Sequence, residues 1–192
     1  MTEGVERFRV MSRDALEPLG RRWTHVQRVA ALASEVGKIF DPTSRATLVA
    51  AAYLHDIGCA PDLAQTGFHP LDGARFVRAH GEEHIAHLVA HHSGARVEAQ
   101  LRGIEGFESE FPFLDSELDQ ALTYCDLTTG PDGARVKLEH RIEEITRRYG
   151  PEHVAARSAI ACFADFDAAR AEIESRMAMA GIELTGSLAF PR

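Results

Sequence analysis

The chain has 192 residues, 45% of them hydrophobic, which is enough to form one folded domain with its own core. Its 29 acidic and 21 basic residues give a formal charge of -8, which argues against a nucleic-acid backbone as the main partner. Its three cysteines lie far apart without a Cys-x-x-Cys pair, and no stretch has the roughly 20 apolar residues of a membrane span. We therefore expect a cytoplasmic protein with no disulfide framework, no thiolate zinc site and no membrane contact.

The first predicted element is a long amphipathic helix over about residues 23–40. Its apolar residues recur in steps of three and four, which is typical of one buried stripe: Val26, Val29, Ala30, Ala33, Val36 and Phe40. His25 lies four residues before Val29 and borders this stripe. A single histidine in that position is more often a hydrogen-bonded core residue than a metal ligand.

The next predicted helix, residues 44–58, is apolar on nearly all sides, which indicates a central, buried helix closed by Gly58 at the C′ position. It carries His55 and Asp56 side by side near its end. An ionised carboxylate in an apolar interior is destabilising unless it is paired or bound to a metal. Imidazole and carboxylate are ligands of divalent iron, manganese and zinc, and a structural hydrogen bond between the two residues is the alternative.

Further helices are predicted over residues 69–81, 82–94, 115–127 and 138–149, and two more helical segments follow up to about Gly181. Asp115 or Ser116 is expected to cap the third of these helices, and residues 103–113 are expected to form a loop. No run alternates with period two for long enough to be a strand. The predicted fold class is therefore all-α, a bundle of about six to eight helices.

Other ionisable residues on these helices have ordinary interpretations when each is considered alone. Asp126 is an aspartate at the C-terminal end of its helix, without an evident purpose. A row at helical spacing is formed by His80, His84, His87 and His91. This row indicates either a second metal site or a partly solvated polar face, and the absence of an accompanying carboxylate motif favours the second.

Taken in order, these residues resemble the HD-domain superfamily of metal-dependent phosphohydrolases. That family has a histidine on one helix, a His-Asp doublet ending the next and an aspartate on a later helix. The matching positions are His25, the HDIG stretch at residues 55–58, and Asp126. The resemblance covers about residues 20–130 and implies an HD-domain helical bundle. We expect residues 1–192 to form a single domain of this type, with a C-terminal helical extension over about 131–192.

A subset of the superfamily uses an additional histidine in His-Pro-x-x-Gly-Ala and a later histidine pair. Here HPLDGA begins at His69, and VAHHSG contains His91 and His92. The resemblance implies two divalent ions per chain, with iron or manganese favoured and magnesium, zinc, cobalt or nickel left open. The implied ligands of the first ion are His25, His55, Asp56 and Asp126. Those of the second are Asp56, His69 and either His91 or His92.

Asp56 is also the implied catalytic residue, because a carboxylate shared by two cations about 3.5 to 4 Å apart leaves room for a bridging water. Arg22 and Arg28 lie three residues before and after His25 on its side of the helix, where they could bind a phosphate. An ordinary solvated helix face is the alternative for both arginines. Many relatives have a lysine directly after HDIG, where this chain has Cys59.

The leading functional hypothesis is hydrolysis of a phosphate ester or anhydride by a metal-activated hydroxide. The expected partner is a phosphorylated small molecule, with nucleotides among the candidates, and homo-oligomer formation stays open. Two alternatives remain at this point. One is an HD-type di-iron oxygenase, and the other is a catalytically inactive nucleotide-sensing module that keeps the metal site.

Overall fold

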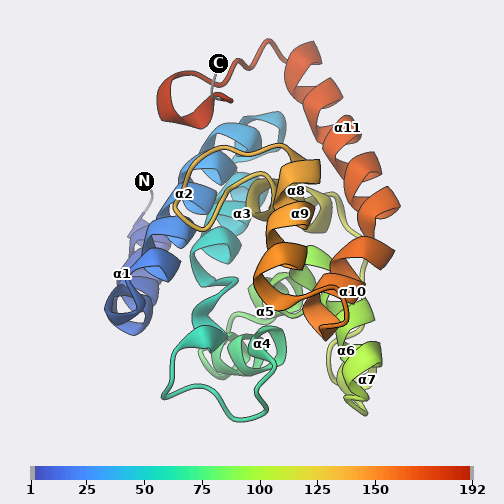
Figure 1. The fold of residues 1–192 in the computed structure, drawn as a ribbon. Helices are drawn as coiled ribbons and strands as arrows, with labels where there is room; N and C mark the ends of the chain where they lie inside the picture. The colour runs from blue at the N-terminus through green and yellow to red at the C-terminus, as the bar shows by residue number, and fades with distance from the viewer. Residues whose placement is uncertain (1–2, 191–192) are drawn as a thin grey trace.

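The computed structural model describes residues 3–190, and the regular elements of this part of the chain are helices (Figure 1). The α-helices are α1 Glu3–Leu16, α2 Arg21–Val36, α3 Pro42–Leu54, α4 His69–Ala79, α5 Glu83–His91, α6 Ala95–Arg102, α7 Phe107–Glu110, α8 Glu117–Leu127, α9 Leu138–Tyr149, α10 Val154–Ala161 and α11 Phe163–Met179. The all-α prediction is confirmed. The helix number exceeds six to eight because α1 and α6 were not predicted and α7 is a single turn within the expected loop. None of the helices in the described part is long and apolar enough to cross a membrane.

Helix α3 is the central element of the bundle and packs against α1, α2, α5 and α8. Its residues 48–54 are all buried, as expected for a helix that is apolar on nearly all sides. Asp41 caps its N-terminus by accepting hydrogen bonds from the backbone N–H groups of Thr43 and Ser44. The helix therefore runs through the core, and the residue that follows its last turn, His55, is also fully buried.

The end of α3 differs from the prediction that Gly58 occupies a C′ position. The helix ends at Leu54, and Gly58 lies in the short 3₁₀ turn η3, Ile57–Cys59, without a positive φ. A Cβ atom on Gly58 would lie 2.1 Å from the carbonyl oxygen of His69 and 2.5 Å from the backbone nitrogen of Gly73. The glycine is required because η3 packs backbone to backbone against the first turns of α4. This contact brings His69 next to the His55–Asp56 pair.

The C-terminal helices pack around a second, smaller group of apolar side chains: Leu127, Leu138, Ile142, Ala159, Cys162 and Phe166. After α11 the chain crosses back toward α2 (Figure 1), where Arg28 donates a hydrogen bond to Ser187 Oγ. The loop between α8 and α9 also reaches α2, because Gly133 packs against the side chain of Arg28. The region after α8 therefore covers the start of α2, which carries His25.

We predict that Gly58→Ala destabilises the protein by about 1 to 3 kcal/mol, because the new methyl group overlaps backbone atoms that cannot move aside. Urea unfolding measures the change in the free energy of unfolding. Gly4→Ala is the matched control: it lies in α1 with no atom within 4 Å of the added Cβ, so its stability should equal or slightly exceed that of the parent. A Gly58→Ala variant as stable as the Gly4→Ala variant would contradict the backbone contact.

Candidate metal centre

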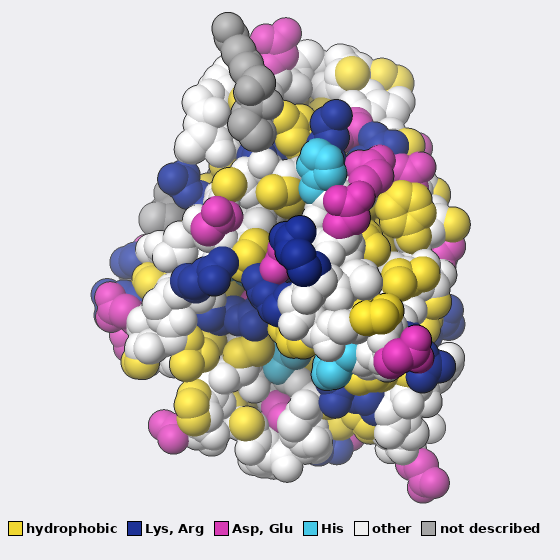
Figure 2. Space-filling view, viewed as in Figure 1, with side chains coloured by type: hydrophobic (Ala, Val, Ile, Leu, Met, Phe, Trp, Pro, Cys, Tyr) yellow, Lys and Arg dark blue, Asp and Glu magenta, His cyan; other side chains and the backbone are white. Residues whose placement is uncertain are grey.

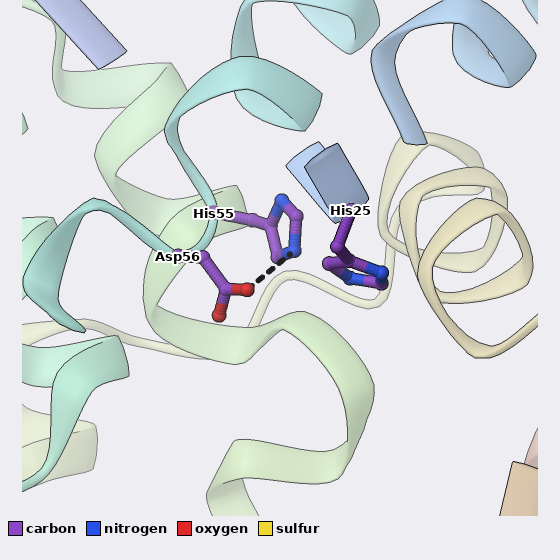
Figure 3. Close-up of side chains that lie close together, drawn as sticks. All are labelled: His25, His55 and Asp56. Atoms are coloured by element: carbon purple, nitrogen blue, oxygen red, sulfur yellow. Dashed lines mark ion pairs between the residues drawn. The ribbon is translucent and has the colours of Figure 1, made fainter. Parts of the chain in front are cut away.

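Three helices bring the first group of polar side chains together in the core. His25 comes from α2, His55 and Asp56 follow α3, and Asp126 lies on α8, and each of the four is at least nine-tenths buried. His25 Nε2 lies 2.9 Å from Asp126 Oδ1. His55 Nε2 lies 3.3 Å from Asp56 Oδ2 and 3.9 Å from Asp126 Oδ1. Figure 3 shows His25, His55 and Asp56 converging, with the dashed line joining His55 to Asp56.

A second group shares Asp56 with the first. The other carboxylate oxygen of Asp56, Oδ1, lies 3.3 Å from His69 Nε2, at the start of α4. His69 Nε2 in turn lies 3.3 Å from His92 Nε2, in the 3₁₀ turn η4, His92–Gly94, that follows α5. The potential ligand atoms of Asp56, His69 and His92 all lie within 4.8 Å of one another, as do those of His25, His55 and Asp56. Asp56 is the residue common to both groups.

The hydrogen bonds of the buried histidines determine which ring nitrogen faces the centre with a lone pair. The Nδ1 atoms of His25, His55 and His92 lie 3.0, 2.8 and 2.6 Å from the backbone carbonyl oxygens of Gly130, Ala52 and Val89. A carbonyl oxygen can only accept, so each Nδ1 carries the proton and donates it. In the neutral rings, each Nε2 therefore presents a lone pair to the centre. This is the arrangement by which metal-binding histidines are held.

The Nε2 atoms then face oxygen or nitrogen atoms that are themselves acceptors. In the neutral ring, His25 Nε2 and Asp126 Oδ1 would be two acceptors only 2.9 Å apart. His55 Nε2 is buried and makes no hydrogen bond in the described structure. Such contacts require a proton or a cation between the two acceptors. The donor set of imidazoles and carboxylates therefore fits a divalent cation.

Without a cation, the carboxylates hold a proton on His55. Although burial lowers the pKa of His55, the charges of Asp56 and Asp126 outweigh this effect and raise that pKa to about 9. Burial lowers the pKa of His92 to about 3, and the neighbouring charge of His55 contributes in the same direction. His55 is therefore charged and His92 neutral at pH 7, although their rings lie only 5.2 Å apart between centroids.

The two aspartates remain ionised despite their burial. Burial raises the pKa of Asp56, but the Arg22 guanidinium, whose Nη1 lies 2.6 Å from Asp56 Oδ2, and His55 hold that pKa well below its usual range. Burial likewise raises the pKa of Asp126, but its contact with the His25 ring and the charge of His55 lower that pKa below its usual range. Both side chains are thus available as anionic ligands at neutral pH.

Two residues that sequence reasoning missed help to position these ligands. Ser93 Oγ donates to Asp126 Oδ2 at 2.5 Å, from a backbone with φ of +52°, a conformation that residues other than glycine rarely adopt. Asp72 accepts hydrogen bonds from the backbone N–H groups of Gln65 and Thr66 and so holds the loop that precedes His69. The position of Ser93 within the VAHHSG motif is the one sequence signal that could have indicated its role.

Of the two adjacent histidines, the structure brings His92 to the centre and leaves His91 outside it. His91 Nε2 donates to the carbonyl oxygen of Phe111 at 2.6 Å, and its ring packs against Phe107 and Phe113. His87 in the same row hydrogen-bonds the carbonyl of Pro112. No member of the row at residues 80, 84, 87 and 91 belongs to a group of potential metal ligands in the described chain.

A pocket of about 350 Å³ adjoins the centre at His25 and Cys59. Its lining residues are Leu19, Arg21, Arg22, His25, Cys59, Pro131, Arg141 and Arg148. Four of the eight are arginines, and Figure 2 shows lysine and arginine side chains gathered across the middle of this face of the molecule. A protein with a net charge of -8 therefore has a locally positive pocket beside its buried carboxylates.

Only one of the two arginines expected from the sequence to bind a phosphate lines this pocket. Arg22 lines it, whereas Arg28 does not, because the Arg28 guanidinium reaches Ser187 instead. Arg141 and Arg148 of α9 were not predicted. A signal existed, since Arg141 follows the buried Leu138 by three residues and Arg148 follows Arg141 by seven, which places both arginines on one side of α9.

The family model described as HD domain matches residues 22–128. Comparison with curated proteins found no match, and comparison with solved structures found none. The match extends from the start of α2 to the end of α8 and includes all the side chains that converge on the centre. It ends before α9, so Arg141 and Arg148 lie outside the matched region.

In the metal-free protein, we expect the free energy of unfolding to be greatest near pH 6.5. Between about pH 3 and 6.5, His92 binds a proton in the unfolded chain but not in the native one, so stability rises with pH. From 6.5 to about pH 9, native His55 keeps a proton that the unfolded chain has lost, so stability falls as pH rises.

Urea unfolding in the presence of a chelator, from about pH 4 to about pH 10, measures this profile. His55→Gln should remove the alkaline decrease while leaving the acidic side in place. A parent protein whose stability does not change between pH 6.5 and 9 would contradict the charged state assigned to His55.

Proposed function

The chain belongs to the HD-domain family, whose members are generally metal-dependent hydrolases, and from this premise we propose that it hydrolyses a phosphate ester or anhydride of a small metabolite. Nucleotides are included in this class. The observation that carries the proposal is the convergence of buried imidazole nitrogens and two ionised carboxylates directly beside a pocket with four arginines. The first feature suits divalent cations, and the second suits a phosphorylated substrate.

Two divalent cations fit the two overlapping groups of side chains. His25, His55, Asp56 and Asp126 would hold one, and Asp56, His69 and His92 would hold the other. When bound, such cations lower the pKa of a water molecule and neutralise phosphoryl oxygens during an in-line displacement. Iron or manganese suits this mixture of imidazole and carboxylate ligands.

Arg22 links the pocket to the centre, because it lines the pocket and also holds Asp56 Oδ2 at 2.6 Å. It fixes the orientation of Asp56 and supplies a positive charge where the phosphoryl group would lie. Cys59 occupies the position after HDIG, and burial together with the charge of Asp56 raises the pKa of its thiol. The thiol is therefore protonated at neutral pH, so we assign it no nucleophilic role.

The di-iron oxygenase alternative would use the same kinds of ligand. The charge of the pocket supports phosphate hydrolysis instead, since an oxygenase substrate without phosphate has no use for four arginines around an opening of about 350 Å³. An inactive sensor would be supported by the loss of a metal-binding side chain. Both groups of described residues retain their imidazoles and carboxylates, so this support is lacking.

We predict that the protein binds two Mn²⁺ or Fe²⁺ ions per chain, as measured by elemental analysis and calorimetric titration. His92→Gln should reduce this number to one, because it removes a ligand of the second group. His91→Gln is the matched control and should retain two ions, because the His91 ring faces the Phe111 carbonyl and not the centre. Binding of less than half an equivalent, or an equal loss in both variants, would contradict the two-ion assignment.

The hydrolase itself is tested by screening phosphorylated metabolites for released phosphate with Mn²⁺ or Fe²⁺ present. We predict that Asp56→Asn lowers kcat/KM by at least about a hundredfold, because Asp56 contributes to both groups. Asp62→Asn, at an exposed position in the following loop, should leave the rate unchanged. Equal phosphate release by the parent and the Asp56→Asn variant would refute the assignment. Oxygen-dependent turnover without released phosphate would favour the oxygenase.

A further inference from the structure

The wall of the pocket that α9 contributes carries an arrangement that the metal centre does not explain. Arg141 Nη1 lies 2.5 Å from Glu144 Oε2, and Arg148 Nη2 lies 2.5 Å from Glu144 Oε1. One carboxylate therefore serves two guanidinium groups. Both arginines line the same pocket as His25 and Cys59, which border the centre.

Arg141 is more deeply buried than an arginine with one partner is expected to be. Its exposed fraction is 8%, and its Nε makes no hydrogen bond in the described structure. A guanidinium has five N–H donors and stays charged at any physiological pH, so it cannot relieve its burial by losing a proton. Buried donors of this kind are normally paired. Arg141 thus has unused capacity for a further anion beside the pocket.

The charges around the pocket are also unbalanced. The four arginines of its lining carry +4, and the two carboxylates paired with them, Asp56 and Glu144, carry -2, which leaves +2. Asp56 already serves the metal centre and Arg22. The excess charge therefore lies with Arg21 and the two arginines of α9, and it matches the dianion of a phosphate group.

We propose that Arg141 and Arg148 form a second phosphate subsite, so that the substrate is a small metabolite carrying two phosphate groups. This inference rests on the proposed function: one phosphate lies at the metal centre, and the other is held by α9. The described lining has no Phe, Tyr or Trp, and its one imidazole, His25, is only 2% exposed, so the pocket offers no open ring on which a nucleobase could stack. Recognition therefore depends on charge and on the separation of the two phosphates.

The competing explanation is a purely structural ion-pair network that holds α9 in place. Arg147 provides the comparison that separates the two explanations. It neighbours Arg148 on α9 but lines a different pocket, with Ile142 and Phe163. Replacing Arg147 changes the net charge of the protein by the same amount without altering the proposed subsite.

The test uses calorimetric titration of the Mn²⁺-loaded protein with alkanediol bisphosphates of two to six carbons and with alkyl monophosphates of the same lengths. We expect at least one bisphosphate to bind about tenfold or more tightly than its matched monophosphate. Arg148→Gln and Arg141→Gln should each remove most of this advantage and leave monophosphate affinity within about twofold of the parent. Arg147→Gln should keep the advantage.

Three results would overturn the subsite: no bisphosphate exceeds its monophosphate, the advantage persists in both variants, or the affinity for monophosphates falls by the same factor. Arg148 is exposed, so its replacement keeps the test usable if Arg141→Gln does not fold. Phosphate release is measured separately. Subsite-dependent binding without hydrolysis would refute the proposed function alone, whereas hydrolysis without a bisphosphate preference would refute the subsite alone.

Discussion

Two ionised carboxylates in the core, Asp56 and Asp126, impose the constraint around which the bundle is organised. Neither would be stable in an apolar interior alone, so α2, the start of α4 and the turn after α5 contribute donors or positive charges to them. Arg22 and His25 come from α2, and His69 comes from the start of α4. The contacts that pack these helices together are therefore the same contacts that assemble the centre.

Much of this arrangement could be predicted from the sequence, because hydrophobic periodicity indicates the helices and an ionisable pair after a fully apolar helix demands a partner. The details that failed depend on packing. Gly58 was wrongly predicted to end a helix. A sequence does not distinguish a glycine needed for a positive φ from one needed for a close backbone contact. His91 and His92 are equivalent in a motif, yet α5 ends between them and turns their rings toward different neighbours.

The pocket was less predictable than the centre, for a physical reason. An arginine on an amphipathic helix is usually solvated, and only the docking of α9 places Arg141 and Arg148 opposite residues more than a hundred positions earlier, such as Arg22. Arg28 shows the converse: it lies on the expected helix, but the returning C-terminal segment engages it through Ser187. The HD-domain core thus carries the potential metal ligands, whereas the region beyond it adds Pro131, Arg141 and Arg148 to the wall of the pocket.

The hydrogen bonds of His25 connect parts of the chain that emerge from the ribosome at very different times. Its Nε2 contacts Asp126 across 101 residues, and its Nδ1 donates to Gly130 across 105. While the first hundred residues are being synthesised, α2 and α3 are available but Asp126 is not. Contacts of such high sequence separation form late, because the entropic cost of closing a long loop comes before the contact can stabilise the chain. We therefore expect the nascent chain to collapse around α3 before its charged centre is complete, because Asp126 becomes available only when α8 has been synthesised.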